Sequence, residues 1–321
     1  MSVPKILLYY LFAPVSDPEA VRLWQRELCD CLGLRGRIII SPHGINGTVG
    51  GELDACKQYI KRTKEYGPFS RLPEYVKWSE GSGFEEATTT VRGANRPSPW
   101  RSIADFPRLS VKVRDELVAF GAPDEVKVGP DGVIGGGVHL SPAQVNDLVA
   151  SRDDVVFLDG RNAYEAAIGK FRGAIVPEIS TTHGFIEALE SGEYDTLKDK
   201  PVITYCTGGV RCEILSALMK NRGFSDVYQI DGGIVTYGEA YGNDGLWDGS
   251  LAVFDGREAV DFAPGAKVIG TCAVCGKASA KLVNCADPSC RARFVACGEH
   301  ATEKCTAHGG RADASPGALA R

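Results

Sequence analysis

The stretch "PVITYCTGGVRCE", residues 201–213, predicts more of the fold than any other part of the chain. It begins with a short apolar run, and a glycine-containing loop joins that run to a segment with helical spacing. Two further apolar runs, 155–159 and 227–230, alternate with helical segments at 141–150, 184–190 and 212–222. Because such alternation is typical of parallel strands covered on both faces, this region predicts an α/β domain built on a parallel sheet.

The loop after residues 201–205 carries the residues best suited to chemistry. Its two glycines let successive backbone N–H groups turn inward, and the start of the next helix completes a concave anion site. A thiol at the centre is biased toward the thiolate, so Cys206 is predicted to be an exposed, ionised nucleophile that could also hold a persulfide. Arg211 adds a fixed positive charge. We assign catalysis to Cys206 and Arg211, and the active-site loop to Thr207, Gly208, Gly209 and Val210.

The polar residues around this loop are assigned supporting roles. The competing interpretation of Cys206 itself is a buried residue at a strand end, beside glycines that only make a turn. Cys212 falls on the first helical turn, where it either packs or acts as a resolving thiol. An Asp-Gly-Arg sequence ends another strand, where ligands of parallel sheets bind, and it either supports the loop or takes part directly. The supporting group is Asp159, Arg161, Cys212 and Glu213. Asn162 and Glu165 are expected to contact this group rather than the reacting atoms.

Residues 1–95 predict a separate α+β domain. Strand patterns occur at 5–14, 36–40, 45–51 and 74–80, and helical spacing occurs at 17–32 and 52–66. Ser16 or Asp17 is placed to cap the first helix. The resulting order, strand–helix–strand–strand–helix–strand, is that of a ferredoxin-like unit. The rest of the chain then divides into a linker at 96–137 and the parallel-sheet domain at 138–265.

Composition and charge narrow the class of protein. The 321 residues are 44% hydrophobic and 24% charged, which is typical of a globular chain of two or three domains. The net charge of −5 argues against a uniformly basic nucleic-acid binder. No apolar stretch approaches the roughly 20 residues of a membrane span, so we expect no membrane association. Six of the eleven cysteines lie between 272 and 305, which favours a reducing compartment, the cytoplasm.

Residues 266–310 predict a small zinc-binding module, followed by a disordered tail at 311–321. Its paired short spacings are typical of tetrahedral zinc. The potential ligands are Cys272, Cys275, Cys285, Cys290, Cys297, His300, Cys305 and His308. They suit two structural ions, held either by neighbouring pairs or, as we favour, by interleaved pairs. In the interleaved scheme one ion takes Cys272, Cys275, Cys297 and His300. The competing interpretation is a flexible tail of unmetallated thiols.

Several of these segments resemble a known family. The loop "CTGGVRCE", residues 206–213, resembles the active site of rhodanese-type sulfurtransferases. Other segments resemble one subgroup, the rhodanese-containing tRNA uridine hydroxylases, over nearly the whole chain and in the same order. They are "GRIIISPHGINGTVGG", "FPRLSVKVRDELVAFG", "VVFLDGRNAYEAAIGKFRGAIVPE", "YQIDGGIVTY" and "VFDGR". Departures from the subgroup's usual pattern are His43, Gly160, His300 and His308.

The resemblance implies an architecture and an activity. The architecture is a ferredoxin-like N-terminal domain, a rhodanese-like domain and a cysteine-rich C-terminus. The activity is the installation of 5-hydroxyuridine at the wobble position of tRNA, with O2 as co-substrate. The expected partners are the tRNA anticodon loop and an electron or oxygen donor that the sequence does not identify. No flavin, haem or iron motif is present in the sequence, and no motif specifies an oligomeric state.

A basic stretch offers a surface for RNA. Residues 57–114 contain twelve Lys and Arg against six Asp and Glu, within a chain whose net charge is −5. This asymmetry favours a local phosphate-binding face. The interleaved aromatic residues, which we expect to stack on unpaired bases, are Tyr59, Tyr66, Phe69, Trp78 and Trp100. The competing interpretation places these aromatics in the core and the charges on a solvated helix face.

Three classes of function remain compatible with these features. The first is an RNA-modifying oxygenase in which Cys206 acts on the pyrimidine or carries an activated oxygen or sulfur species. The second is a sulfurtransferase that moves sulfane sulfur from thiosulfate or a persulfide to a thiol acceptor. The N-terminal domain and the basic stretch count against it. The third is a phosphatase or a zinc–RNA adaptor. Phosphatase loops of this kind have about five residues between Cys and Arg, whereas this loop has four.

Overall fold

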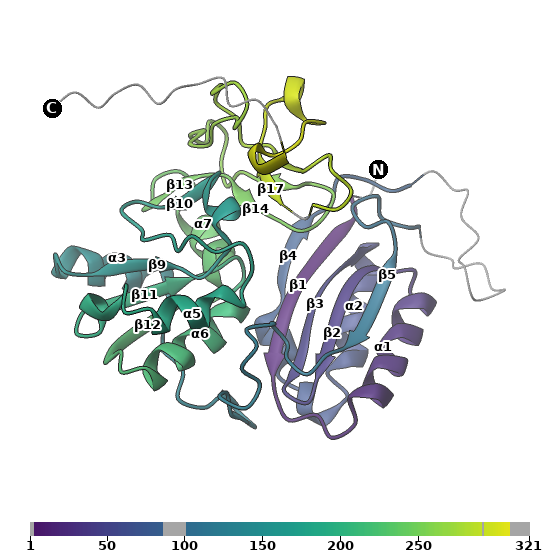
Figure 1. The fold of residues 1–321 in the computed structure, drawn as a ribbon. Helices are drawn as coiled ribbons and strands as arrows, with labels where there is room; N and C mark the ends of the chain where they lie inside the picture. The colour runs from purple at the N-terminus through teal and green to yellow at the C-terminus, as the bar shows by residue number, and fades with distance from the viewer. Residues whose placement is uncertain (1–2, 86–100, 291, 309–321) are drawn as a thin grey trace, which may run out of the picture. The chain divides into compact units, whose positions relative to one another are not determined.

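The computed structural model describes residues 3–85, 101–290 and 292–308 (Figure 1). The chain forms two compact units. The first contains residues 1–137 together with 210–223 and 255–257, and the second contains the remainder. The tail that we expected to be disordered, 311–321, lies outside the described residues. Within the described ranges, no helix combines the length and the apolarity that a bilayer-spanning segment needs.

The first unit is built on a five-stranded sheet in the order β4-β1-β3-β2-β5. The expected ferredoxin-like unit is confirmed, because β1, α1, β2, β3, α2 and β4 follow one another in the predicted order. These elements are β1 (Lys5–Phe12), α1 (Pro18–Cys31), β2 (Arg35–Ser41), β3 (Gly44–Gly51), α2 (Leu53–Thr63) and β4 (Lys77–Glu80). Asp17 caps α1, since its Oδ1 accepts a hydrogen bond from the N–H of Ala20 at 2.9 Å.

The stretch that we expected to be a linker contributes to this sheet. Within 96–137, β5 (Leu109–Val113) pairs with β2 in parallel and becomes an edge strand. Its sequence alternates basic and apolar residues, which is the pattern of a half-buried strand rather than of a connector. A small hairpin follows, formed by β6 (Val128–Gly129) and β7 (Gly132–Val133).

One face of the first sheet is covered by α1 and α2 (Figure 1). Alternate residues of β1, Leu7, Tyr9 and Leu11, point into this core. Tyr59 of α2 is fully buried there, hydrogen-bonded to Tyr9, and donates to Gln25 at 2.6 Å. The opposite face carries the other side chains of each strand.

The second unit contains a four-stranded parallel sheet in the order β8-β12-β11-β9. Its strands are β8 (Val138–Leu140), β9 (Val156–Asp159), β11 (Pro201–Tyr205) and β12 (Asp226–Ile230). Its helices are α3 (Pro142–Ser151), α4 (Ala163–Ala166), α5 (Gly184–Glu190) and α7 (Gly233–Tyr241). The parallel sheet expected for this region is therefore confirmed, and β8 is an additional strand that was not predicted.

The remaining elements are short. A second small sheet joins β10 (Gly169–Phe171) to β13 (Trp247–Gly249), and a hairpin joins β14 (Leu251–Ala252) to β15 (Ala259–Val260). The C-terminal module contains the hairpin of β16 (Leu282–Asn284) and β17 (Arg293–Val295). Helix α6 (Val210–Asn221) belongs to the first unit and begins directly after the cysteine loop.

Candidate functional site

Cys206 follows the last residue of β11, and the loop ends where α6 begins at Val210. Gly209 has φ of +102°, a conformation that favours glycine, and its N–H donates to the Cys206 Sγ at 3.2 Å. A backbone donor therefore points at the sulfur, as the sequence predicts. The expectation that the thiol is exposed is wrong, because Cys206 is buried. The hydrogen bond favours the thiolate, whereas burial favours the neutral thiol.

The start of α7 closes the loop from its other side. The N–H of Ile234 donates to the Cys206 carbonyl at 2.9 Å, and that of Val235 donates to the Thr207 carbonyl at 3.0 Å. Gly233 has φ of +67°, and a Cβ there would lie 2.5 Å from the Cys206 oxygen and 2.7 Å from the Gly209 nitrogen. Only glycine fits this contact. The sequence analysis did not predict this contact of Gly233 with the cysteine loop, although "IDGG" at 230–233 was the available signal.

Asp159, Arg161 and Tyr205 form a buried network beneath the cysteine. Two guanidinium nitrogens of Arg161 donate to the Asp159 carboxylate at 2.9 and 2.7 Å, and both side chains are fully buried. The Tyr205 hydroxyl donates to the same carboxylate at 2.8 Å, and the N–H of Gly160 donates to the Tyr205 carbonyl at 2.8 Å. Because Tyr205 directly precedes Cys206, these contacts fix the strand end that carries the thiol.

The charges of this network stabilise one another. Burial lowers the pKa of the Arg161 guanidinium, but the neighbouring Asp159 charge outweighs burial and raises that pKa above its ordinary value. Burial, followed by the Asp159 charge, raises the pKa of Tyr205 well above its ordinary value. Arg161 thus stays a charged guanidinium and Tyr205 a neutral phenol near neutral pH. Such an arrangement suits a support for the loop better than a group that exchanges protons with substrate.

The other predicted residues occupy two helix starts. Arg211, Cys212 and Glu213 lie in the first turn of α6 and are buried, and the Tyr10 hydroxyl of β1 donates to the Glu213 carboxylate at 3.0 Å. Glu165 accepts a hydrogen bond from the N–H of Asn162 at 3.1 Å and so closes the start of α4.

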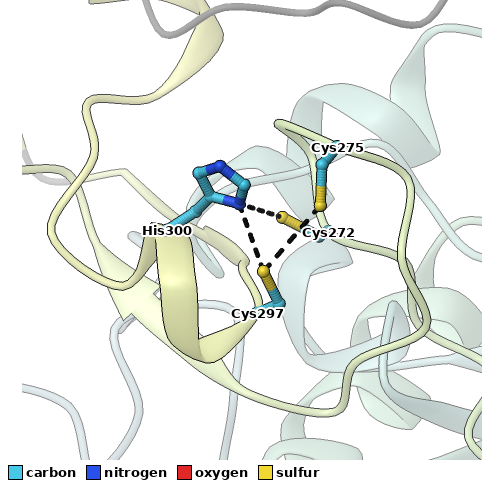
Figure 2. A group of neighbouring side chains, drawn as sticks. All are labelled: Cys272, Cys275, Cys297 and His300. Carbon is cyan, nitrogen blue, oxygen red and sulfur yellow. Dashed lines mark hydrogen bonds between the residues drawn. The ribbon is translucent and has the colours of Figure 1, made fainter.

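The eight Cys and His residues of the C-terminal module gather in two groups, and the ligand atoms within each group lie within 4.8 Å of one another. These two groups contain the residues that the interleaved pairing assigns to each ion. The first contains Cys272, Cys275, Cys297 and His300 (Figure 2), and the second contains Cys285, Cys290, Cys305 and His308. Each group joins two ligand pairs that are separated in sequence by a pair belonging to the other group. The clusters thereby tie together segments that few buried apolar residues hold.

The spacing of the ligand atoms suits tetrahedral coordination. With Zn–S of about 2.3 Å and Zn–N of about 2.0 Å, a tetrahedron places two sulfurs about 3.8 Å apart and a sulfur and a nitrogen about 3.5 Å apart. In the first group the Sγ atoms of Cys275 and Cys297 are 3.8 Å apart, and the Cys272 Sγ is 3.7 Å from the His300 Nδ1. In the second group the Sγ atoms of Cys290 and Cys305 are 3.9 Å apart. Three thiolates and an imidazole are a donor set that zinc prefers.

Backbone N–H groups favour the thiolate of one cysteine in each group, Cys272 and Cys285. Burial disfavours the thiolate of Cys272, but backbone N–H groups of Cys297, Cys275 and Val274 outweigh burial and lower the pKa of Cys272 to about 6. In the second group, the N–H groups of Cys305 and Asp287 donate to the Cys285 sulfur at 3.3 and 3.4 Å. They outweigh burial in the same way and lower the pKa of Cys285 to about 7.

The aromatic residues expected to stack on RNA divide between core and surface. Tyr59 and Phe69 are fully buried, so their predicted contact with bases is wrong. Tyr66 packs edge-on against Phe69 and 6.1 Å from the ring of Trp24, centre to centre, as part of the same core. Trp78 of β4 is exposed. Trp100, together with Arg92 and Arg96 of the basic stretch, lies outside the described residues.

Comparison with family models matches three regions. Residues 4–117 match a UPF0176 acylphosphatase like domain, 141–240 match a rhodanese-like domain, and 248–309 match a rhodanase C-terminal region. The acylphosphatase-like match extends past residue 95 and includes β5. The rhodanese-like match contains Cys206 and Gly233, and the C-terminal match contains both Cys/His groups.

Several relatives match nearly the whole chain, and each is named tRNA uridine(34) hydroxylase. The protein of Corynebacterium jeikeium (strain K411) is 58% identical over 308 residues, which cover 96% of this chain and 93% of its own. That of Corynebacterium aurimucosum is 57% identical and covers 98% and 96% of the two chains. That of Corynebacterium glutamicum (strain R) is 60% identical and covers 92% and 89%.

Proposed function

Since the chain belongs to the tRNA uridine(34) hydroxylase family, we propose that it hydroxylates the wobble uridine of tRNA at C5, with O2 as co-substrate. The observation that carries the proposal is the geometry at Cys206. A sulfur held at the end of a parallel strand, with a backbone N–H directed at it, is suited to nucleophilic chemistry. The matches cover 92–98% of this chain and 89–96% of the three relatives, so the premise applies to nearly the whole chain.

Cys206 acts on the uracil ring in this proposal. Its thiolate adds to C6, which makes C5 electron-rich and able to take an oxygen atom from an oxidant. C5 then loses its proton, the C6–S bond breaks, and the thiolate is restored. Replacing hydrogen with hydroxyl removes two electrons from the ring, and with O2 as oxidant the second oxygen atom leaves as water. A two-electron donor, not identified by the sequence, supplies the electrons for that water.

The surrounding residues have positioning roles. The Gly209 N–H holds the sulfur while it is negatively charged, before addition and after release. The start of α7 holds the loop carbonyls and keeps the inward orientation of the amides. Arg211, in the first turn of α6, provides positive charge near the anionic species. Asp159, Arg161 and Tyr205 keep the strand end in register beneath the thiol.

The two Cys/His groups are proposed to hold one structural zinc ion each. Zinc here would supply cross-links rather than Lewis-acid chemistry, because four protein ligands fill each coordination sphere. We further infer that the protein works in the cytoplasm, where its thiols stay reduced and tRNA is present.

Nucleoside analysis of tRNA tests the proposed activity. A strain lacking this gene should lose 5-hydroxyuridine from its tRNA, and expression of the full chain should restore it. A parallel assay with thiosulfate and cyanide tests the alternative of a rhodanese-type sulfurtransferase. Rapid thiocyanate formation by the purified protein, together with unchanged 5-hydroxyuridine in the deletion strain, would replace the hydroxylase proposal with the sulfurtransferase.

Metal analysis tests the zinc proposal. The purified chain should carry about two zinc ions, and Cys272→Ser should carry about one. Because structural zinc sites contribute about 10–16 kcal/mol of binding free energy, chelation should unfold the C-terminal module. Cys31→Ser is the matched control, since Cys31 is exposed and belongs to neither group. A chain with well under one zinc and an unchanged module would rule the sites out.

A further inference from the structure

A stripe of positive charge follows the edge strand β5. The segment from Arg108 to Arg114 alternates in sequence, so Arg108, Ser110, Lys112 and Arg114 share one face while Val111 points into the core. All three cations of the stripe are exposed. On a strand, side chains two residues apart lie about 6.6 Å from one another, so the stripe extends for roughly 20 Å.

The neighbouring strand completes a groove on this face. Arg37 of β2 lies directly beside Ser110, and Ile39 lies beside Lys112. Together with Phe106 and Pro107, these residues line a depression of about 690 Å³ whose charged members are all cationic. Phe106 itself is buried, so it forms part of the wall rather than a free stacking platform. The depression is therefore an anionic-ligand groove with an apolar base.

The cations of this groove have no acidic partners in the described part of the chain. Arg37, Arg108 and Lys112 form no ion pair there, and Arg114 donates to the carbonyl of its neighbour Val113 at 2.8 Å. Other arginines of the same unit are neutralised. Arg35 pairs with Glu85 at 2.8 Å, and Arg101 pairs with Glu52 at 3.1 Å. In a chain of net charge −5, four clustered cations without carboxylates indicate a ligand that supplies the negative charge.

The register of the sheet shows what else shares this face. Tyr10 of β1 is opposite Asn46 of β3, Asn46 is opposite Ile39, and Ile39 is opposite Lys112. Residues opposite one another project from the same face of a sheet, so Tyr10 and the groove are on one face. Tyr10 donates to Glu213 in the first turn of α6 at 3.0 Å. Three strand spacings, about 14 Å, separate Tyr10 from Lys112.

We propose that the β2–β5 groove binds consecutive phosphates of the tRNA backbone during the reaction. This inference rests on the proposed function and deepens it by assigning the substrate-binding surface. Guanidinium groups form charge-assisted, bidentate hydrogen bonds with phosphate oxygens, and a linear row of cations matches a linear row of phosphates better than a single anion. The groove shares its sheet face with the residue that contacts α6, the helix that begins after Cys206.

Charge reversal in the full chain tests the groove. The groove variant is Arg108→Glu with Lys112→Glu. The matched control is Lys57→Glu with Lys61→Glu on α2, two exposed lysines on a helix that covers the opposite face. Binding of labelled tRNA is measured by fluorescence anisotropy across a range of NaCl concentrations. The groove variant should bind at least about ten-fold more weakly than the control, and the salt dependence, d log K/d log [salt], should fall in magnitude by about 1.4 for two lost phosphate contacts.

The outcomes separate this inference from the proposed function. Because both replaced side chains are exposed, the variant should fold; the milder Arg108→Gln with Lys112→Gln tests the same point if it does not. Equal binding of tRNA by the groove and control variants, with unchanged salt dependence, would contradict the proposal that the groove binds tRNA phosphates. Displacement of tRNA by inorganic phosphate at constant ionic strength would also overturn it, in favour of a small-anion site. Normal 5-hydroxyuridine in the deletion strain, with groove-dependent RNA binding intact, would overturn the proposed function alone.

Discussion

The tripeptide Asp-Gly-Arg occurs twice, at 159–161 and at 255–257, and folds in the same way each time. In both copies the backbone N–H of the arginine donates a hydrogen bond to the aspartate two residues earlier. The Nε and Nη2 of the same arginine donate to the two oxygens of that carboxylate. The distances are 2.9 and 2.7 Å in the first copy and 2.7 and 2.6 Å in the second. The Asp and Arg side chains thus close a hydrogen-bonded ring, and this ring is a property of the three residues.

Their surroundings give the two rings different roles. Arg161 and Asp159 are fully buried, with further hydrogen bonds to the Gly169 carbonyl and from the Tyr205 hydroxyl. Arg257 retains 16% side-chain exposure and donates to the Ser79 hydroxyl and the Glu80 carbonyl of β4, both at 3.0 Å. The first ring supports the strand that carries Cys206, and the second attaches a loop to a sheet edge. Burial and the third partner, rather than the tripeptide itself, therefore determine the structural role of each ring.

The largest effect should come from breaking the buried ring. Arg161→Met leaves the Asp159 carboxylate buried without its cation, and such a change costs about 3–5 kcal/mol. We expect this loss in the free energy of unfolding measured by urea denaturation, with loss of 5-hydroxyuridine formation. A cost below about 1 kcal/mol would remove the distinction between the two rings.

Gly233→Ala disturbs the same loop through a residue at the start of α7. The new Cβ would meet three backbone atoms of the cysteine loop, the nearest at 2.5 Å, at a residue with positive φ. We expect a cost of about 2–3 kcal/mol and a large fall in activity. Gly223→Ala is the matched control, because Gly223 also has positive φ but open space around it. If both variants behave alike, backbone strain alone explains the loss and the contact with the loop does not.

Arg257→Met breaks the second ring. Solvent reaches this guanidinium and screens the charge that is left behind, so we expect a smaller cost of about 1–2 kcal/mol. Hydroxylation per folded molecule should be unaffected, since the ring supports a sheet edge rather than Cys206. Loss of activity without loss of stability would show that the second ring also serves the site.

A similarly small effect should come from Tyr205→Phe, which removes one hydrogen bond to a carboxylate that keeps its arginine, at a cost of about 1–2 kcal/mol. The pKa of Tyr205 is raised in the folded state by burial and by Asp159. Its contribution is therefore complete below about pH 10, the unfolded value, and is lost as pH rises further. Unfolding curves from pH 8 to 11 should show a weaker alkaline loss of stability in the variant than in the native chain. Parallel curves would contradict this account of Tyr205.

Local patterns predicted much of this molecule. The apolar run ending at Cys206 and the glycines after it were enough to predict the strand, the loop and the helix, because each depends on neighbouring residues. The ligand spacings of the C-terminal module likewise predicted eight ligands for two ions, with the interleaved pairing preferred to neighbouring pairs. The order of the N-terminal elements followed from residue periodicity, and Asp17 was among the two residues expected to cap the first helix.

Long-range packing accounts for what was missed. Gly233 meets Cys206 across 27 residues of sequence, and no local pattern encodes that contact. The burial of Cys206 depends on the same closure. Tyr59 and Phe69 looked available because they lie among charged residues, but the helix face and turn that carry them point into the core. The alternating charges of β5 concealed a strand whose partner, β2, is about 70 residues earlier.

The central claim is that the Cys206 sulfur performs the reaction. It is tested by expressing Cys206→Ser, with Cys31→Ser as control, in the deletion strain and quantifying 5-hydroxyuridine in purified tRNA. Both proteins should accumulate as folded, zinc-loaded chains. We expect full restoration by the control and at least a roughly 10³-fold lower rate with Cys206→Ser, in line with the loss of an essential nucleophile. Normal 5-hydroxyuridine with Cys206→Ser would contradict the account.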